Sequence, residues 1–338
     1  MSESHEILSL AEAEALIASA LAGVGVAAPA AASVARALVA AEAEGQVGHG
    51  FSRLADYAAQ VQTGKVDGAA VPICQRTAPG RVEVDAAHGF AYPALEAGIT
   101  ALIEAAQAAG TASLAIRRSH HCGALSVQVE KLAQAGLVGL MVANAPAAMA
   151  PFGAKTPVFG TNPIAFAVPR PGKPPLVIDL SLSRVARGKV MHAKKSGQPI
   201  PEGWALDAEG QPTTDAEAAL TGTMLPIGEA KGTALALMVE ILAASFTGAN
   251  ASPGISSFFT ADGPPPGAGQ FLLALQPADA AGFATRLEAL LSLIEGAEGA
   301  RLPGTRRIKT LARAQAEGIA VPKAYVEQAR ALAGLAPV

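Results

Sequence analysis

The stretch TASLAIRRSHHCGALSVQVEKLAQAGLVGLMVA, residues 111–143, decides the fold class of this chain. Its apolar run at 112–116 predicts a strand, and the periodicity at 124–135 predicts a helix that Gly136 closes. The apolar run at 137–143 then predicts a second, buried strand. Strands and helices that alternate in this way predict a sheet with helices packed against it.

Outward from this stretch, strands and helices continue to mix between about residues 80 and 295. The alternation around Val82 and Val84 predicts a strand. Short apolar runs predict further strands at 164–168, 176–180 and 271–275, and periodicity predicts helices at 93–109, 233–246 and 280–294. The Gly/Pro-rich residues 262–269 are predicted to form a surface loop.

Both ends of the chain are predicted to be helical. Ser9 and Glu12 have the spacing of a capping box, and Pro29 suits the first turn of a second helix. The tail after residue 306 has the pattern of amphipathic helices. We therefore expect an α/β (α+β) core at residues 76–299, and a helical cap at residues 1–75 that residues 300–338 complete.

The composition argues against several classes of protein. Hydrophobic residues make up 51% and charged residues 16% of the 338 positions, so the chain can bury a large core. A net charge of −3 disfavours a nucleic-acid-coating surface, which needs clustered lysine and arginine. Two cysteines are too few for a disulfide framework and fit a reducing compartment. Without a basic leader or ~18 uninterrupted apolar residues, we expect a cytoplasmic protein with no membrane partner.

The chain lacks the usual dinucleotide fingerprint. Residues 23–28, GVGVAA, match the letters G-x-G-x-x-A, but they follow a predicted helix, so we interpret them as a helix stop and loop. No phosphate-binding loop, nucleophile elbow or H-E-x-x-H pair is present. His120 and His121 have no cysteine or carboxylate at zinc-ligand spacing, so no metal site is predicted.

Residues 45–53, GQVGHGFSR, form the first candidate site. Glycines on both sides of His49 allow a ligand to approach its imidazole closely. Arg53 lies about one helical turn later and offers a bidentate grip on a carboxylate. A histidine near its ordinary pKa of ~6.5 exchanges protons at neutral pH. A helix-terminal histidine followed by a surface arginine fits the same letters equally well.

Further candidate segments lie where predicted strands end. Residues 117–123, RRSHHCG, lie between a strand and a helix, where backbone N–H groups and basic side chains favour anions; an ordinary charged loop is the alternative. Polar and glycine-rich segments of the same kind occur at 159–163, 179–183, 187–189, 228–232 and 303–307. Each of these segments is unremarkable alone.

Taken together and in order, these segments resemble the malate/L-lactate dehydrogenase family of NAD(P)-dependent oxidoreductases, which is unrelated to the Rossmann-type lactate dehydrogenases. The resemblance extends from about residue 9 to 310. The segments that carry it are His49, Gly50, Arg53 and Tyr57; Ser119, His121 and Gly123; FGTNP at 159–163; PEG at 201–203; PTTD at 212–215; KG at 231–232; and PG at 303–304.

The resemblance implies a non-Rossmann fold with a central mixed or antiparallel sheet, and a homodimer whose partner subunit helps to close the site. It implies that His49 donates a proton to the C2 oxygen or nitrogen of a small carboxylate substrate. The implied substrate-binding residues are Arg53, Thr161, Arg187 and Gly188. The implied cofactor-binding residues are His121, Cys122, Gly123, Ala124, Leu125, Asp179, Leu180, Ser181, Ala230, Lys231, Gly304, Arg306 and Arg307.

Two positions depart from the family pattern. Gly48 stands where the family usually has a serine directly before the active histidine, and His120 stands where many members have asparagine. The Gly-His-Gly spelling resembles sulfolactate dehydrogenase-like members. His120 also occurs in the branch that reduces cyclic imines such as Δ1-piperideine-2-carboxylate.

The resemblance implies hydride transfer between a nicotinamide cofactor and a 2-oxo or 2-hydroxy acid, with His49 as the proton donor. Lys189 is expected to stabilise the developing charge or to fix the tautomer of His49. Arg306 and Arg307 favour NADPH over NADH because they can bind a 2′-phosphate, although Arg117 and Arg118 compete for that role. The alternatives are an NADPH-dependent cyclic imine reductase and a non-catalytic binding protein on this scaffold.

Overall fold

The computed structural model describes residues 4–335 and is built around a seven-stranded mixed sheet. The strands run in the order β2-β3-β4-β11-β5-β6-β7, and only the β3–β4 pair is parallel. Their bounds are β2 Ile73–Ala78, β3 Arg81–Asp85, β4 Thr111–Ser119, β5 Val138–Ala143, β6 Ile164–Val168, β7 Leu176–Leu180 and β11 Ala268–Leu275. The expected α/β fold with a mixed sheet is confirmed.

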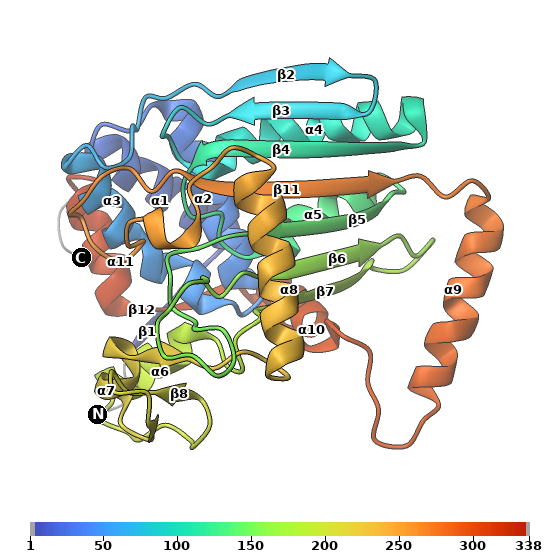
Figure 1. Cartoon of the computed structure of the whole chain (residues 1–338). Helices are drawn as coiled ribbons and strands as arrows, with labels where there is room; N and C mark the ends of the chain where they lie inside the picture. Colours follow the sequence, from blue (N-terminus) through green and yellow to red (C-terminus); the bar gives the residue numbers. More distant parts are fainter. Residues whose placement is uncertain (1–3, 336–338) are drawn as a thin grey trace.

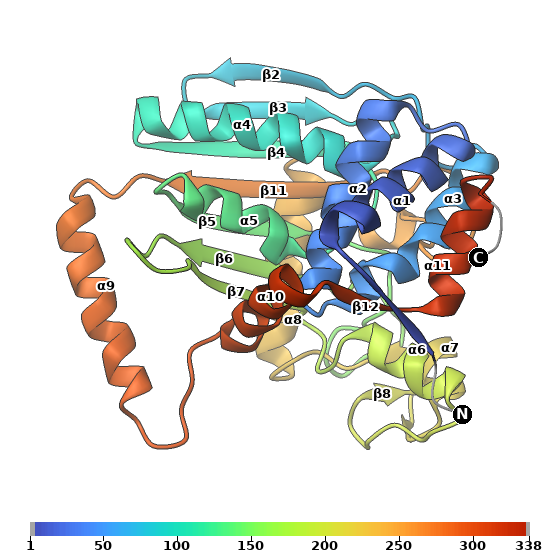
Figure 2. The same cartoon turned by 180° about the vertical axis from the view of Figure 1, so that it is seen from behind.

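Helices cover both faces of this sheet (Figures 1 and 2). On one face lie α4 (Ala91–Ala109) and α5 (Leu125–Gln134), whose apolar sides join the strands in the main hydrophobic core. On the other face lie α8 (Ala230–Glu240) and the π-helical turn Ile241–Ser245 that continues it. The sheet therefore forms the middle layer of three.

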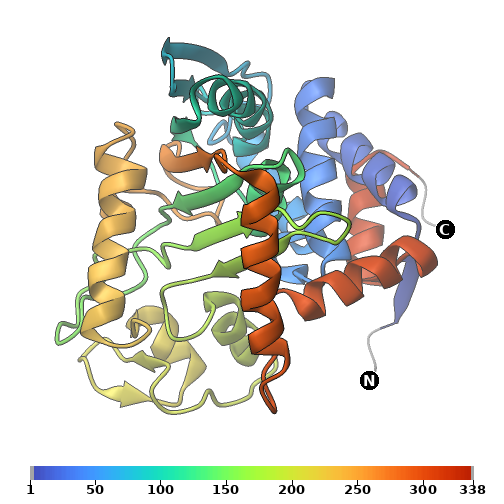
Figure 3. The ribbon, with the colours of Figure 1, turned by 90° about the vertical axis from the view of Figure 1, so that its right-hand side faces the viewer.

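The terminal segments pack together at one end of the sheet (Figure 3). They comprise α1 (Leu10–Gly23), α2 (Ala28–Ala43), the 3-10 turns Val47–His49 and Phe51–Arg53, α3 (Leu54–Gln62), α10 (Thr305–Glu317) and α11 (Lys323–Leu332). Residues from both ends of the chain share one apolar core. The expected capping box at Ser9 and Glu12 is present at the start of α1.

The chain ends are not entirely helical, contrary to the sequence-based expectation. β1 (His5–Leu8) pairs antiparallel with β12 (Ile319–Pro322), which ties the start of the described chain to its end. Each strand has four residues, and their pairing joins segments about 300 positions apart in sequence. Local periodicity carries no information on such a long-range pair, so the pattern could not reveal it.

A small subdomain follows β7. It contains α6 (Arg187–Lys195), α7 (Ala216–Thr221) and a three-stranded sheet of β8 (Ala205–Leu206), β9 (Pro212–Thr213) and β10 (Thr223–Met224). Beyond β11, α9 (Ala280–Glu295) stands apart from the main body (Figure 1). A 3-10 turn, Ser252–Gly254, precedes the predicted loop. In the described part of the chain, none of the helices combines the length and the hydropathy of a membrane span.

Candidate active site

Two consecutive 3-10 turns present His49 and Arg53, with Gly50 between them. A Cβ atom on Gly50 would lie 1.9 Å from Oε2 of Glu42, so only glycine fits there without displacing that carboxyl group. Oε2 of Glu42 in turn accepts a hydrogen bond of 2.9 Å from the Phe51 N–H. By contrast, nothing lies within 4 Å of the Cβ position on Gly48. The histidine turn is therefore tightly packed on one side of His49 and open on the other.

The imidazole of His49 stacks on that of His121, with 5.3 Å between ring centroids and 18° between ring planes. Nδ1 of His121 lies 2.6 Å from the Tyr57 hydroxyl, which lies 3.0 Å from the Tyr92 hydroxyl. Nδ1 of His49 is buried and has no hydrogen-bond partner within residues 4–335. The fold thus brings together the histidines of two predicted site segments that are 72 positions apart in sequence.

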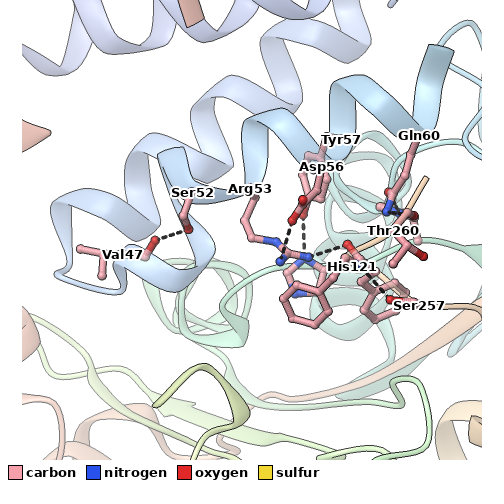
Figure 4. A network of polar contacts seen from close by, with 12 residues as sticks. Val47, Ser52, Arg53, Asp56, Tyr57, Gln60, His121, Ser257 and Thr260 are labelled. Carbon is pink, nitrogen blue, oxygen red and sulfur yellow. Dashed lines mark hydrogen bonds and ion pairs between the residues drawn. The ribbon is translucent and has the colours of Figure 1, made fainter. Parts of the chain in front are cut away.

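Arg53 is only 3% exposed and forms the positive centre of this group. Its Nη1 lies 3.2 Å from Oδ2 of Asp56, and its Nη2 donates to the Phe258 carbonyl at 2.9 Å. The Phe259 ring lies over the guanidinium at 4.3 Å (Figure 4 shows Arg53 and Asp56). Nε of Arg53 is buried and unpaired in the described structure. A buried guanidinium with an unused donor fits a carboxylate ligand.

The histidines around Arg53 are held in their neutral form. Burial, with the Arg53 charge as the second cause, lowers the pKa of His49 to about 4. Burial, the Arg53 charge and then the Lys65 charge lower the pKa of His120 to about 3, and burial is the main cause that holds the pKa of His121 well below its ordinary value. We call His49, His120, His121, Tyr57 and Arg53 the histidine cluster. Its one fixed charge near pH 7 is the Arg53 guanidinium.

Two carboxylates, Glu44 and Asp179, meet at Ser126, and Glu42 lies two positions before Glu44; we call the three the carboxylate cluster. Oδ2 of Asp179, near the end of β7, accepts a 2.8 Å hydrogen bond from the Ser126 N–H at the start of α5. The Ser126 hydroxyl donates to Glu44, which also binds Arg307. Loss of hydration is the main cause that raises the pKa of Asp179 to about 6 and that of Glu42 to about 7.

Three of the expected cofactor segments lie around this second cluster. Gly304 lies against β7, where a Cβ atom would be 2.9 Å from the Val177 carbonyl oxygen. The φ of +77° at Gly304 also favours glycine. Three segments therefore meet here: residues 121–125, residues 179–181 and residues 304–307. Their binding roles stay predictions, but the structure places them around one helix N-terminus.

The side chains of several expected cofactor residues point into the protein. Cys122, Ala124 and Leu125 are almost completely buried, the first and last of them in the main core, so their backbone groups are what they can offer to a ligand. Burial raises the pKa of the Cys122 thiol to about 12, which excludes a thiolate near neutral pH. At Gly123, which has a φ of +69°, a Cβ atom would lie 2.7 Å from the Tyr92 hydroxyl.

Of the arginines expected to bind a 2′-phosphate, most are already paired. Arg307 bonds to Glu44 and Glu130, and Arg117 and Arg118 both pair with Asp85. These ion pairs could not be foreseen because their acidic partners are distant in sequence. The guanidinium of Arg306 is exposed and has no partner in the described chain. Arg306 is therefore the cation in this turn that remains available to an anionic ligand.

Backbone hydrogen bonds link three of the segments that hold the remaining predicted site residues. The Leu182 N–H donates to the Thr161 carbonyl at 2.8 Å, and the Ile227 N–H donates to the Leu182 carbonyl at 2.8 Å. Ala230 and Lys231 open α8 shortly afterwards, and Leu180 and Ser181 precede Leu182. Arg187, Gly188 and Lys189 open α6. Among the described residues, no hydrogen bond or ring contact joins these three to His49, Arg53 or His121, so their roles stay predictions.

Sequence reasoning missed several residues that contact the histidine cluster. Gln60 bonds to the His120 ring, and Phe258 lies 5.2 Å from the His121 ring. Gln60 follows Arg53 and Tyr57 at helical spacing, so this pattern was a usable signal. Phe258 comes from a loop about 200 positions away and had no such signal. Within the described residues, no group of three or more histidine, cysteine, aspartate or glutamate side chains has the arrangement of a metal site.

Comparison with known proteins identifies the family. The family model for malate/L-lactate dehydrogenase matches residues 8–330. The (2R)-3-sulfolactate dehydrogenase (NADP(+)) of Chromohalobacter salexigens is 50% identical over 328 residues, which cover 97% of this chain and 98% of that protein. A Delta(1)-pyrroline-2-carboxylate/Delta(1)-piperideine-2-carboxylate reductase of Pseudomonas syringae pv. tomato is 43% identical over 297 residues, which cover 87% of each chain.

Solved structures agree with this assignment. The delta1-piperideine-2-carboxylate reductase of Pseudomonas syringae superposes with a TM-score of 0.91 at 39% identity, covering 97% of this chain and 99% of that one. The sulfolactate dehydrogenase of Methanocaldococcus jannaschii superposes with a TM-score of 0.88 at 27% identity, covering 98% of both chains. The chain belongs to the malate/L-lactate dehydrogenase family and is an oxidoreductase of that family.

Proposed function

We propose that this protein is an NADP(H)-dependent oxidoreductase that interconverts a 2-oxo acid and a 2-hydroxy acid of the malate, lactate or sulfolactate type. The observation that carries the proposal is the stack of His49 on His121 beside the buried, partly unpaired Arg53. A sulfolactate dehydrogenase that is 50% identical over nearly the whole chain supports the same substrate class.

In this proposal the bound nicotinamide cofactor supplies or accepts the hydride, and the protein positions the substrate and manages its charge. Arg53 binds the α-carboxylate of the substrate through donors that include Nε, which fixes the position of C2. His49 transfers the proton to or from the C2 oxygen. Thr161, Arg187 and Gly188 line the substrate, and Lys189 assists His49 or the developing charge.

The low pKa of His49 determines how the proton moves. With a pKa of about 4, the imidazole of the free protein is neutral at pH 7 and is ready to accept a proton from a hydroxy acid. A carboxylate bound to Arg53 offsets the positive charge that helps to lower this pKa. Binding of the anionic acid therefore raises the pKa of His49, which favours the imidazolium that the reductive direction needs.

The cofactor assignment depends on Arg306. Its unpaired guanidinium follows the Gly304 turn and is suited to a 2′-phosphate, whereas Arg307 already has two carboxylate partners. The other contributors are His121, Cys122, Gly123, Ala124, Leu125, Asp179, Leu180, Ser181, Ala230 and Lys231, with Cys122, Ala124 and Leu125 acting through their backbone. An Arg306→Ala variant should raise KM for NADPH and leave KM for NADH unchanged.

The second candidate function is reduction of a cyclic imine, Δ1-piperideine-2-carboxylate or Δ1-pyrroline-2-carboxylate. Phe258 and Phe259 place an aromatic surface beside Arg53 and the histidines, and such a surface suits an apolar ring. The reductase of Pseudomonas syringae, at 43% identity, supports this candidate. An imine that is already cationic also needs less help from a serine at position 48.

We also propose a cytoplasmic homodimer. Leu237, Met238 and Ile241 lie on α8 and the turn that continues it, and each side chain is exposed although apolar. A second copy of the chain is the occupant expected for this face, because the family resemblance implies a dimer. The cytoplasmic location is supported by the two free cysteines. Light scattering of the purified protein tests the dimer.

The experiment that tests the proposed function is a reduction assay with a panel of substrates. Pyruvate, oxaloacetate, sulfopyruvate and the two cyclic imines are each offered with NADPH and with NADH, and the loss of nicotinamide absorbance is followed. We expect NADPH-dependent turnover with a 2-oxo acid, at the highest rate with sulfopyruvate. Faster turnover of a cyclic imine favours the second candidate. No turnover with any pair contradicts both and favours a non-catalytic binding protein.

A further inference from the structure

Lys65 is a buried lysine just beyond α3 that binds three backbone carbonyl groups. Lys65 is only 2% exposed. Nζ donates to the carbonyl oxygens of Ser257 and Asp262 at 2.7 Å and to that of Thr260 at 3.0 Å. An ammonium group has three donors, so these contacts use all of them. The charge of the Asp262 carboxylate acts on Lys65, but among the described residues no ion pair within 4.0 Å joins Nζ to a carboxylate.

The segment that Lys65 binds, residues 257–262, is here called the aromatic strap. Two further side chains donate to carbonyl groups of the strap. Arg53 bonds to the Phe258 carbonyl, and the Thr63 hydroxyl bonds to the Ala261 carbonyl at 2.9 Å. Gln60 adds a 3.0 Å bond to the Thr260 carbonyl, and Figure 4 shows this contact. The strap has no regular secondary structure, so these side chains fix its path.

The strap places two aromatic rings against the histidine cluster. The Phe258 ring lies 5.5 Å from the His120 ring and 5.2 Å from the His121 ring, and the residue is only 5% exposed. The Phe259 ring covers one face of the Arg53 guanidinium and is 41% exposed. The Phe259 ring therefore shields that face of the guanidinium from a ligand.

We propose that Lys65 is a positioning residue that holds the aromatic strap against Arg53, and that Phe259 determines how the substrate carboxylate reaches that arginine. Phe259 also limits the size of the C2 substituent, because the open part of its ring lies beside the carboxylate position. The role in substrate binding rests on the proposed function. The role of Lys65 in holding the strap does not.

The first test measures the strap itself and needs no turnover. Chymotrypsin cleaves after exposed aromatic residues, and cleavage after Phe258 or Phe259 is followed by mass spectrometry under native conditions. We expect Lys65→Met to accelerate this cleavage about tenfold and Lys65→Arg to restore most of the protection, because a guanidinium also donates to carbonyls. Lys131→Met, which removes a partly buried lysine from α5, is the matched control and should cleave like wild type. Equal cleavage of Lys65→Met and wild type overturns the proposal.

The second test links the strap to the substrate. We expect Lys65→Met and Phe259→Ala each to raise KM for the preferred acid about tenfold, with kcat changed less than threefold and KM for NADPH unchanged. If no substrate turns over, the Kd of oxamate replaces KM, so failure of the proposed function leaves this test intact. Phe259 is partly exposed, so its replacement is compatible with folding even if Lys65→Met does not fold.

A double variant decides whether Lys65 acts through the ring. When Phe259 is already absent, adding Lys65→Met should raise KM, or the Kd of oxamate, by less than twofold more, because both changes remove the same surface. Phe259→Ala should also increase the ratio of kcat/KM for phenylpyruvate to kcat/KM for pyruvate about tenfold. If the protein turns over neither acid, the ratio of the two binding affinities should increase by the same factor. The proposal is overturned if the double variant raises KM, or the Kd of oxamate, by the product of the two single effects. It is also overturned if Phe259→Ala keeps the wild-type preference for pyruvate over phenylpyruvate.

Discussion

The histidine cluster and the carboxylate cluster both touch the turn at residues 47–53, and both are poorly hydrated, yet their pKa values move in opposite directions. Burial lowers the pKa of His49 to about 4, whereas it raises the pKa of Glu42 to about 7. In both cases the uncharged form is favoured, because desolvation penalises charge. Arg53 remains as the fixed charge of the histidine cluster, so an anion is attracted there rather than to the carboxylates.

The largest expected effect follows from removing that charge. Arg53→Ala should raise KM for the acid about 100-fold, because it removes the buried positive charge that we propose binds the substrate carboxylate. The pKa of His49 should rise as well, since the Arg53 charge is its second depressing cause. Steady-state kinetics against pH measure both effects. An unchanged KM would show that the two clusters do not differ in their affinity for anions.

The variant Glu42→Gln tests the raised pKa of Glu42 in the carboxylate cluster. In wild type the folded state keeps the Glu42 proton up to about pH 7, whereas the unfolded state loses it near 4.5. Wild-type stability from this group therefore decreases as pH rises from about 4.5 to 7. Glutamine mimics the protonated form, so the variant should gain up to about 3 kcal/mol relative to wild type between pH 5 and 8. Urea unfolding at both pH values measures this gain, and a pH-independent difference would contradict it.

Gly50, where the turn packs on Glu42, provides the next test. Its replacement by alanine brings a Cβ atom within 1.9 Å of Oε2 of Glu42, which should cost about 1–3 kcal/mol of unfolding free energy. Gly48→Ala is the matched control, because nothing lies within 4 Å of its Cβ position. Thermal unfolding of the two variants compares them, and equal melting temperatures would argue against the tight packing on Glu42.

The smallest effect is expected on the open side of His49. Gly48→Ser introduces the serine that the family usually has at this position, and the structure leaves room for its Cβ atom. Because Nδ1 of His49 is buried and unpaired, a nearby acceptor should raise the pKa of His49 and change kcat by about two- to tenfold. The pH dependence of kcat reports this change. A kinetic profile identical to wild type would mean that the hydroxyl does not reach the imidazole.

The sequence was sufficient to predict six of the seven strands of the main sheet, all but β2, because these strands carry strong local patterns. It also marked the two segments whose histidines, His49 and His121, stack on each other. It was not sufficient to predict the β1–β12 pair, whose strands are short and lie at opposite ends of the chain. The same reason explains why the partners of Arg307 and the strap residues Phe258 and Phe259 were missed. Contacts between distant segments leave no periodic signal in a single sequence.

The most direct test of the central claim is the single-turnover rate of NADPH oxidation by His49→Ala with the acid that wild type reduces fastest. If His49 delivers the proton, this rate should fall by about 10²- to 10⁴-fold. The Kd for NADPH should stay at the wild-type value, because the proposed role of His49 concerns the substrate and not the cofactor. A single-turnover rate equal to that of wild type, with the acid bound at the same affinity, would contradict the account.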